Sequence, residues 1–548
     1  MAEDEKAEVR AAVFNHLAGI VIAPTVKALS DRRVFDLFES SSTSRKLDEV
    51  VEKTHASRGY MGVALRLLAS CGWLKQKAND NRQSPSYELT QEGSIALKLG
   101  PMLYGEVTSF VSKAIFLEDF LYGKTDGPVM PSLQELVRRS KESWGIHPHA
   151  DPAEAKVRNQ MRRQLDGMLI GPSMVALARG GVLAQMEQGP VDISSFAANR
   201  ASLAAILDLL ATQGWVACDR NKVVFTPCGR YAAQIATSYG VTVSYLPLFD
   251  NVSTLLFGNP RIPRIDENGV ELLVNRAMNV WGSGGAHKTY FKKIEEIIVE
   301  IFNRPLNLQP RGICDMGCGD GTLLEHLYVV VKNHTLRGGA LDKYPLMLIG
   351  ADFNKVARRV AKQNLRKAGI PLFHVIPGDI NRPAQLASDL EGLGYDIHDL
   401  LHVRSFLDHN RPYSPPANYI RGERIGRTTG AFAYLGQEIS ADELEENLVR
   451  HLRRWAPYVG RFGLLVLELH TLPPELAAAN LEKTPAVAYD GTHGFSDQYL
   501  VELPIFLDCA REAGLEADTR FQAKFPASEL ATVSLNYFSA AGNHAVVC

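Results

Sequence analysis

The strongest constraint on the fold of this chain is a glycine-rich turn in its second half. Residues 311–328 read RGICDMGCGDGTLLEHLY, an apolar strand followed by an amphipathic helix that opens at Thr322. Three glycines stand at alternate positions between the strand and the helix: Gly317, Gly319 and Gly321. Glycine allows a sharp turn at the carboxyl end of a strand and lets a ligand approach the backbone closely. The spacing departs from the G-x-G-x-x-G of dinucleotide sites, and the acidic Asp315 before the turn suits a cationic ligand.

Two further predicted strands end in acids. The first has the sequence LIGAD and ends at Asp352, and a predicted helix at residues 355–367 follows it. The second has the sequence FHVI and is followed by Pro-Gly and Asp379. An earlier acid, Asp342, is a weaker rival of Asp352. Strands and helices that alternate in this way predict a doubly wound parallel α/β domain over residues 265–548.

These segments resemble the motifs of the class I S-adenosylmethionine-dependent methyltransferases, which have a Rossmann-like fold. The resemblance implies that the glycine loop lies against the cofactor, that Asp352 accepts hydrogen bonds from both ribose hydroxyls, and that Asp379 accepts one from the adenine amino group. The alternative is a tight glycine turn with one acid capping a helix and the other in a turn. Three motifs in the family's order favour the cofactor. The expected cofactor-binding residues of this set are Asp315, Gly317, Gly319, Gly321, Asp352 and Asp379.

The first 260 residues are predicted to be mostly helical and contain an internal repeat. Residues 65–74 read LRLLASCGWL, and residues 206–216 read ILDLLATQGWV. Each copy continues with a short strand and a Thr-x-x-Gly motif, which is the element order of a winged-helix module. A recognition helix for DNA carries several side chains that reach base edges, whereas these two segments hold one charged residue each. A structural or dimerisation role is therefore favoured over DNA binding.

We expect three domains. Residues 1–122 hold the first winged-helix-like repeat, and residues 123–264 hold a linker and the second repeat, which would serve as a lid or for dimerisation. Residues 265–548 form the S-adenosylmethionine-binding domain. Residues 123–152 are rich in Gly, Pro and Ser and are predicted to form a loop.

Composition excludes other classes of protein. The 59 Lys and Arg residues nearly balance the 61 Asp and Glu residues, for a net charge of −2, which argues against binding to nucleic acid or an anionic membrane by bulk charge. The most apolar early stretch, residues 17–24, is far shorter than the roughly 18 apolar residues that mark a membrane span. The acidic N-terminal residues lack the pattern of a secretory signal, and the 7 cysteines form no C-x-x-C pair. We therefore expect a cytoplasmic location and reduced thiols.

Three histidines are predicted to gather at the sheet edge where the cofactor would bind. Asp408 and His409 follow the predicted strand DLLHVRSF, and His470 follows the strand FGLLVLEL. His493 is predicted to reach the same edge from a loop. Imidazoles with an amide or carboxylate oxygen suit a first-row divalent metal, and Gln437 or Asp408 would supply that oxygen. Each histidine taken alone is more simply explained as a hydrogen-bonded core or rim residue.

His409 has a second possible role as a general base. Plant-type small-molecule O-methyltransferases carry Leu-His-Asp-Trp at this place, whereas here Asp precedes His, a departure that weakens the case for simple hydroxyl deprotonation. The expected catalytic residues are His409, Asp408 and Arg404. Residues 404–427 form an arginine-rich loop, which is either a solvated face or a surface for a carboxylate or phosphate, such as a phosphopantetheine arm or an acidic carrier protein.

A glycine segment before the first strand, WGSGGAH at residues 281–287, has two interpretations. In the first, it closes over the methionine end of the cofactor, with Gly284 among the cofactor-binding residues. In the second, it is only a flexible joint that leads into a helix at residues 290–302.

Over most of its length the chain resembles the methyltransferase domains of bacterial polyketide assembly lines, specifically the apratoxin type found beside a GNAT-like decarboxylase. The resemblance rests on WGSGGAH at 281, DMGCGDG at 315, HVRSFLDHN at 402 and LELHTLPPEL at 467. It implies methyl transfer from S-adenosylmethionine to carbon of a substrate such as malonyl on an acyl carrier protein, within or beside a polyketide synthase module.

Some members of that family carry a mononuclear iron, and a metal that chelates both carbonyl oxygens of a malonyl group would stabilise its enolate. Iron or another first-row metal is therefore the second expected cofactor, with His409, Gln437, His470 and His493 as its expected ligands. Two alternatives remain at this point. One is O-methylation of a small natural product with His409 as general base, and the other is a DNA-binding regulator that uses the fold as a ligand sensor.

Overall fold

The chain folds into two compact units. The computed structural model describes residues 1–38, 44–77, 84–123, 129–196, 199–219 and 222–540. The helical unit comprises Met1–Ala286, Ala431–Glu438 and Pro473–Asp497. The sheet unit comprises His287–Gly430, Ile439–Leu472 and Gln498–Cys548. The boundary between the units falls inside helix α15 (Arg276–Phe302), and the chain passes back into the helical unit twice.

The sheet unit contains a mixed sheet with the strand order β14-β16-β13-β10-β7-β8-β9. The strands from β13 to β9 lie parallel to their neighbours, whereas β16 runs antiparallel to β13, β14 and β15. The strand bounds are β7 Gly312–Met316, β8 Met347–Asp352, β9 Phe373–Pro377, β10 Leu400–Ser405, β13 Leu464–Leu469, β14 Leu515–Ala517, β15 Ala523–Phe525 and β16 Val533–Ala540. The predicted doubly wound α/β fold is confirmed, and the parallel strands bring their carboxyl ends to one edge.

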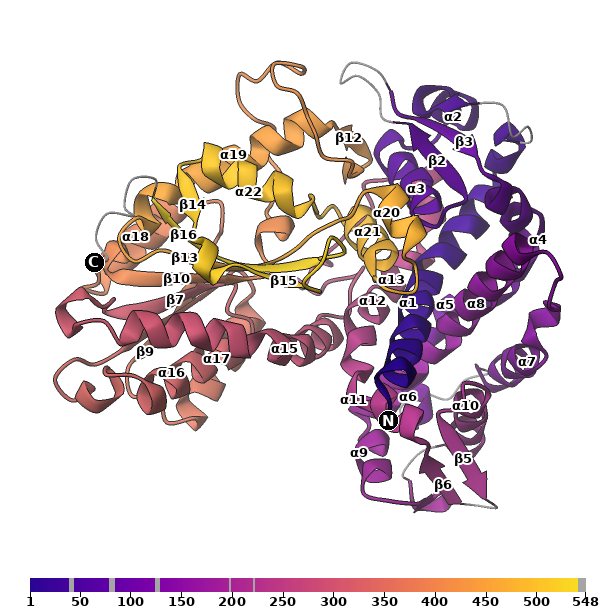
Figure 1. The fold of residues 1–548 in the computed structure, drawn as a ribbon, viewed down its shortest axis with the longest axis horizontal. Coiled ribbons are helices and arrows are strands. Elements are labelled where there is room, and N and C mark those ends of the chain that lie inside the picture. The colour runs from indigo at the N-terminus through magenta and orange to yellow at the C-terminus, as the bar shows by residue number, and fades with distance from the viewer. Residues whose placement is uncertain (39–43, 78–83, 124–128, 197–198, 220–221, 541–548) are drawn as a thin grey trace. The chain divides into compact units, whose positions relative to one another are not determined.

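Helices cover both faces of this sheet (Figure 1). One face packs against α15, α16 (Thr322–His334) and α17 (Lys355–Lys367), with Leu401 and Val403 of β10 in the shared apolar core. The other face lies under α18 (Pro383–Gly392), α19 (Ala441–Val459) and α22 (Leu503–Glu512). Because successive side chains of a strand alternate between faces, Arg404 of β10 points toward Trp455 of α19.

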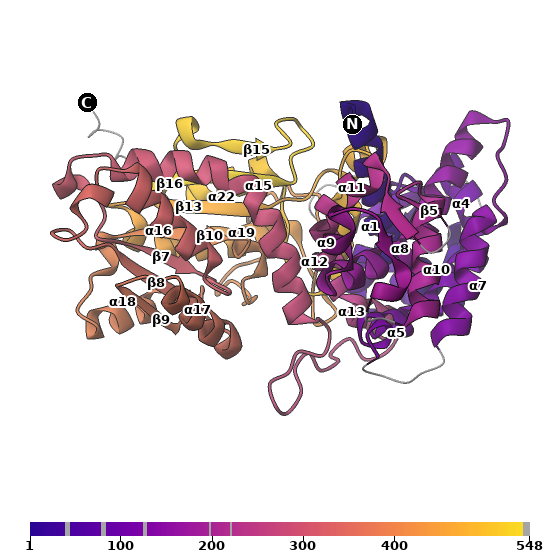
Figure 2. The same ribbon diagram turned by 90° about the horizontal axis from the view of Figure 1, so that it is seen from below.

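Two long helices cross closely at the centre of the helical unit. α1 (Glu3–Asp31) packs along α8 (Pro152–Arg179), as Figure 2 also shows. A Cβ on Gly19 of α1 would lie 1.9 Å from the Gln164 carbonyl oxygen, so only glycine permits this approach. By length and composition α1 would suffice to cross a membrane, a candidate that the short run at residues 17–24 did not predict. Most of its apolar stretch is buried inside the unit, as in the core helix of a globular domain.

Shorter elements surround this pair. Their bounds are α2 Leu47–Thr54, α3 Arg58–Ser70, α4 Gln91–Thr108, α5 Val111–Ala114, α6 Leu117–Leu121, α7 Val129–Lys141, α9 Val182–Glu187, α10 Arg200–Thr212, α11 Pro227–Gln234, α12 Gly240–Ser244, α13 Leu246–Asp250, α14 Val252–Phe257, α20 Pro474–Ala479 and α21 Ala486–Phe495. The strands are β1 Arg45–Lys46, β2 Leu74–Lys77, β3 Ser86–Leu89, β4 Val191–Asp192, β5 Val216–Asp219, β6 Lys222–Phe225, β11 Phe432–Tyr434 and β12 Gln437–Ile439. The loop predicted over residues 123–152 is wrong in part, because α7 lies within it and ends in the basic residues that favour a helix C-terminus.

The predicted internal repeat is confirmed down to its hydrogen bonds. In the second copy, α10 is followed by Trp215, the hairpin of β5 and β6, and α11. Thr226 caps α11 by accepting a hydrogen bond from the Gly229 amide (3.0 Å), and its hydroxyl donates to the Gly214 carbonyl (2.7 Å). A Cβ on Gly229 would lie 1.6 Å from the Trp215 carbonyl oxygen, so the Thr-x-x-Gly motif fastens the helix start against the Gly-Trp turn.

The first copy repeats each of these contacts. Thr90 accepts from the Gly93 amide (2.9 Å) and donates to the Gly72 carbonyl (2.7 Å), and a Cβ on Gly93 would lie 1.9 Å from the Trp73 carbonyl oxygen. The two winged-helix-like modules therefore make the same backbone contacts between the Thr-x-x-Gly motif and the Gly-Trp turn.

Two insertions from the second half of the chain complete the helical unit around α3. The hairpin of β11 and β12 and the segment carrying α20 and α21 both pack on this helix. Asp497, at the end of the second insertion, accepts hydrogen bonds from Tyr60 (2.7 Å), Arg264 (2.7 Å) and the Leu435 amide (3.1 Å). Asp490 pairs with Arg66 in the interior of the unit, where both side chains are less than one tenth exposed.

Removing the acid of this buried pair tests how strongly the second insertion supports the unit. Asp490→Ala leaves the Arg66 guanidinium buried without its partner, so we expect the free energy of unfolding to fall by about 3 to 5 kcal/mol. Chemical denaturation of the full chain, followed by tryptophan fluorescence, measures the loss. Glu142→Ala removes an exposed partner of Arg138 and is expected to cost less than about 1 kcal/mol. Equal losses in the two variants would contradict the assigned role of the buried pair.

Candidate active site

The three glycines of the turn adopt backbone conformations that only glycine takes readily. Gly317, Gly319 and Gly321 have φ angles of 80°, 53° and 84°. The Gly317 amide donates to the Ala351 carbonyl (2.7 Å), and the Gly319 amide donates to the Asp352 carboxylate (3.0 Å). A Cβ on Gly319 would meet nothing within 4 Å, so the space above the loop is open. The turn therefore joins the ends of β7 and β8 and leaves room for a ligand.

Asp315 lies beneath this turn with almost no exposure to solvent. Burial raises the pKa of its carboxyl to about 7, and the charges of Asp352 and Asp320 add to the effect. Its Oδ1 atom is buried and has no hydrogen-bond partner among the residues that the structure describes. A carboxyl group with an unsatisfied buried oxygen beside other acids fits a cationic ligand with N–H donors, as the sequence predicted.

The acid at the end of β8 is Asp352 rather than its rival. Asp352 closes β8 at the carboxyl edge, whereas Asp342 is exposed and precedes the amino end of the same strand. The next residue, Phe353, is 81% exposed, which is unusual for an aromatic side chain and provides an apolar surface beside the open turn. Asp379 follows β9 at the same edge and accepts a hydrogen bond from the Asn381 amide (2.9 Å). The described residues of the sheet unit thus fit S-adenosylmethionine.

His409 and Glu468 form a buried pair at this edge. His409 follows β10 and Glu468 lies at the end of β13, and the His409 Nδ1 atom donates to Glu468 Oε1 (2.5 Å). The same carboxylate accepts the His409 amide (3.1 Å). With Nδ1 as the donor, the Nε2 atom of a neutral imidazole carries the lone pair of a base. Leu407, two residues before His409, lies against the glycine turn at Gly317.

Sequence analysis missed Glu468. The signal was present, because Glu468 is the one charged residue in the otherwise apolar strand LLVLEL. A charged residue in a buried strand needs a partner.

His470 has both ring nitrogens engaged. Its Nδ1 atom donates to the Val501 carbonyl (3.2 Å), and its Nε2 atom accepts from the Ser534 hydroxyl (2.7 Å). Burial lowers the pKa of His470 to about 4, so the ring is neutral at pH 7. Coordination to a metal would displace one of these hydrogen bonds, and this arrangement is that of a core histidine.

The remaining predicted metal ligands belong to the helical unit. Gln437 is exposed on β12, and the His493 Nδ1 atom donates to the Tyr489 carbonyl (2.6 Å) within α21. Among the residues that the structure describes, no group of three or more His, Cys, Asp and Glu side chains is placed to hold a metal ion. The ligand set, with residues in both units, therefore stays a prediction, and no step of the chemistry below is routed through a metal.

Asp408 and Arg404 are buried partners of each other rather than groups at the surface of the site. Each is about 1% exposed, and Arg404 Nη1 donates to Asp408 Oδ1 (2.7 Å). Burial alone would raise the pKa of Asp408, but Arg404 and the hydrogen bond from His451 outweigh it and hold the pKa well below its usual value. These two residues lie under the site, on the side of α19.

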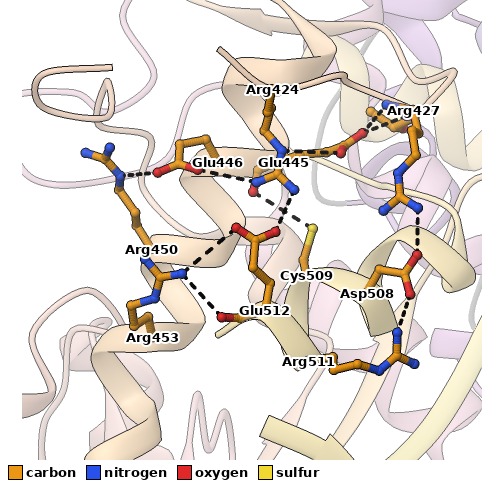
Figure 3. Close-up of polar contacts among 11 residues, drawn as sticks. Arg424, Arg427, Glu445, Glu446, Arg450, Arg453, Asp508, Cys509, Arg511 and Glu512 are labelled. Carbon is orange, nitrogen blue, oxygen red and sulfur yellow. Dashed lines mark hydrogen bonds and ion pairs between the residues drawn. The ribbon is translucent and has the colours of Figure 1, made fainter. Parts of the chain in front are cut away.

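The arginine-rich loop is bound to the sheet unit by acids (Figure 3). Arg424 donates to Glu512 (2.8 Å) and Glu446 (3.3 Å), and Arg427 donates to Asp508 (2.8 Å). These acids lie on α19 and α22, so the ion pairs fasten the loop to both helices. The charges of Arg424 and Arg427 are thereby balanced within the unit, which favours the structural interpretation of these two arginines over an anion-binding surface.

The glycines of the 281–287 segment serve a helix crossing. The segment lies inside α15, which begins at Arg276, so the helix predicted to begin at residue 290 starts earlier. A Cβ on Gly282 would lie 2.7 Å from the backbone of Gly240, and a Cβ on Gly285 would lie 2.4 Å from Thr237. A Cβ on Gly284 would meet none of the described atoms within 4 Å, and Gly284 stays a predicted cofactor contact.

The chain matches three family models in order along its length. The AprA N-terminal domain matches residues 9–76, the AprA winged helix domain matches residues 166–259, and the AprA MT2-like domain matches residues 271–536. The comparison with curated protein sequences gives no match. The order of the models follows the order of the two repeats and the sheet unit.

The fold is also similar to solved structures of low sequence identity. The mitomycin 7-O-methyltransferase MmcR is 14% identical with a TM-score of 0.42, over 71% of this chain and 99% of that one. PigF with SAH is 13% identical with a TM-score of 0.39, over 69% and 97%. The CurJ carbon methyltransferase is 14% identical with a TM-score of 0.32, over 75% and 97%.

The raised pKa of Asp315 predicts a pH dependence of cofactor binding. S-adenosylmethionine is cationic and favours the ionised carboxylate, so below pH 7 each bound cofactor must displace a proton. The dissociation constant is then expected to fall by up to about tenfold per pH unit as the pH rises toward that pKa. Calorimetric titration in two buffers of different ionisation enthalpy measures both the affinity and the released proton. Asp315→Asn should bind more weakly and lose this dependence, and an equal slope in both proteins would contradict the prediction.

Proposed function

The chain belongs to the AprA MT2-like family of S-adenosylmethionine-dependent methyltransferases, and from this premise we propose that it methylates carbon of an acyl group bound to a carrier protein. The observation that carries the proposal is the buried His409–Glu468 pair, which supplies a base at the carboxyl edge of the sheet beside the glycine turn. A carbon between two carbonyl groups, as in a malonyl thioester, is acidic enough for a histidine base to take its proton.

The residues of the sheet unit divide the chemistry among them. The glycine turn, Asp315 and Asp352 would hold S-adenosylmethionine, whose sulfonium supplies an electrophilic methyl group. His409 Nε2 takes the proton from the acidic carbon, and Glu468 stabilises the imidazolium that forms. The electron pair of the broken C–H bond then forms the new C–C bond, and S-adenosylhomocysteine leaves with the electrons of the C–S bond. A base at this place is useful only where the cofactor methyl group is near, which the contact of Leu407 with Gly317 supports.

The same pair supports a second candidate function, O-methylation of a small natural product. A hydroxyl group needs its proton removed in the same way, and His409 would again be the base. The two reactions differ in the atom that carries the new methyl group. Incubation of malonyl-loaded carrier protein with the cofactor, followed by alkaline hydrolysis of the thioester and of any methyl ester and mass analysis of the released acid, distinguishes them. Methylmalonic acid supports carbon methylation, and malonic acid alone contradicts it.

Variants of the pair test the base. His409→Ala is expected to lower kcat by about 10²- to 10⁴-fold, the range for loss of a general base. Glu468→Gln should also lower kcat, because the amide can donate a hydrogen bond to Nδ1. The imidazole proton then lies on Nε2, which can no longer accept a proton from the substrate. Steady-state assays at saturating cofactor measure both effects, with the exposed Glu300→Gln as control. Normal rates in either variant of the pair would contradict the proposal.

Metal removal tests the expected second cofactor directly. Since both ring nitrogens of His470 are engaged in hydrogen bonds, prolonged dialysis against EDTA is expected to leave the transfer rate within about twofold of the untreated protein. Elemental analysis before and after dialysis verifies that any metal has been removed. A loss of activity that iron(II) restores would contradict this prediction and establish a metal requirement.

A further inference from the structure

We propose that Arg404, Asp408 and His451 form a buried positioning triad that holds the segment 406–411, and with it His409, in place at the cofactor edge. The inference rests on the proposed function of His409 as a base. None of the three side chains reaches the surface of the site, so they act through the backbone of the segment. His451, on α19, has no counterpart in the sequence motifs.

The triad centres on one carboxylate oxygen. Asp408 Oδ1 accepts hydrogen bonds from Arg404 Nη1 (2.7 Å) and from His451 Nε2 (2.9 Å). All three side chains are at most 1% exposed. The guanidinium of Arg404 also stacks over Trp455 of α19, with 4.1 Å between its central carbon and the ring centroid. The carboxylate is therefore fixed from β10 on one side and from α19 on the other.

The backbone around His409 is held with equal completeness. Arg411 Nη1 donates to the Asp408 carbonyl (2.8 Å), and Arg411 itself is held by Asn447 of α19 (2.8 Å). The His409 amide donates to Glu468, and its carbonyl accepts from the Tyr499 amide (2.8 Å). The peptide group between Asp408 and His409 thus has a partner at its carbonyl and at its amide, and the His409 carbonyl has another, which limits the rotation of the histidine relative to the sheet.

The chain needs this support because it leaves β10 through a strained conformation. Phe406 has a φ angle of 54°, which is unfavourable for an aromatic residue. Such conformations persist where the surrounding structure determines them, and they concentrate at functional sites. Here the turn sends Leu407 toward Gly317 and Asp408 into the interior.

The triad is a poor way to stabilise a core, which favours a role in geometry. Arg404 Nε, Asp408 Oδ2 and His451 Nδ1 are buried atoms without hydrogen-bond partners among the described residues. Buried charges and unsatisfied polar atoms cost stability, and an apolar cluster of similar volume would avoid that cost. Burial lowers the pKa of His451 to about 4, so a neutral ring serves Asp408 as a hydrogen-bond donor at pH 7.

Four variants separate positioning from folding. Asp408→Asn keeps the shape but weakens the contacts, His451→Leu removes a donor, and His451→Gln retains one. His402→Gln is the matched control, because His402 lies on the same strand and face as Arg404, is 2% exposed, and makes its ring contacts with Trp455 and the Ile397 carbonyl. Calorimetric titration with S-adenosylmethionine shows whether each variant is folded, since the glycine turn is untouched. We expect affinities within about twofold for all four, because none of them contacts the cofactor-binding residues.

Kinetics with malonyl-loaded carrier protein give the decisive comparison. We expect kcat to fall about 100-fold in Asp408→Asn and His451→Leu with KM for the cofactor unchanged, as for a misplaced catalytic group. His451→Gln should recover most of the lost rate, and His402→Gln should keep it. The triad is overturned if His402→Gln loses as much kcat as Asp408→Asn, or if the glutamine at position 451 does no better than leucine.

A readout without turnover keeps this test separate from the proposed function. Long-range proton–nitrogen NMR spectra of histidine-labelled protein, assigned with His409→Gln, report the ring of His409 directly. Its nitrogen shifts are expected to change in Asp408→Asn and His451→Leu but not in His402→Gln. If the wild-type chain binds the cofactor but transfers no methyl group, the proposed function fails while these spectra still decide the triad, and unchanged His409 signals would overturn it.

Discussion

The repulsion between carboxylates at one edge of the sheet is the interaction on which the rest of the site depends. Asp315 is buried beneath the glycine turn, and Asp352 and Asp320 stand close enough to raise the cost of ionising it. The turn reduces this repulsion, because its left-handed glycines direct the Gly319 amide toward Asp352 and leave the space above the loop open. A cationic ligand in that space would offset the remaining negative charge. The parallel strands then deliver His409 and Glu468 to the same edge, so binding and proton transfer depend on one arrangement of charge.

The site residues that the sequence could predict are those at the ends of strands. An apolar run that stops at glycines or an acid marks the carboxyl edge of a parallel sheet, and so Asp315, Asp352 and His409 were placed correctly at that edge. Gln437 and His493 could not be assigned to a unit from the sequence. Their segments leave the sheet unit and fold into the helical unit. The sequence of a short hairpin or of an ordinary amphipathic helix does not indicate which of two cores it packs against.

The number of charges on the arginine-rich loop could be read from the sequence, but the acids that pair with them could not. The acids that neutralise Arg424 and Arg427 lie on α19 and α22, between 22 and 88 residues further along the chain, and their position facing the loop follows only from the packing. The sequence also could not show that Arg404 is buried, because nothing in it distinguishes this arginine from the exposed Arg421 and Arg427. Its place on the face of β10 that packs against Trp455 separates it from those two.

The route of the chain also limits how such a protein can change over evolutionary time. Because residues 431–438 and 473–497 leave the catalytic sheet to surround α3, neither unit corresponds to an uninterrupted stretch of gene. A single crossover before residue 431 would leave one product with a helical unit that lacks the Asp490 and Asp497 contacts, and the other with a sheet unit whose two insertions have no α3 to pack on. The two units can therefore be inherited, exchanged or duplicated only together, because each is encoded by separated stretches of the same gene.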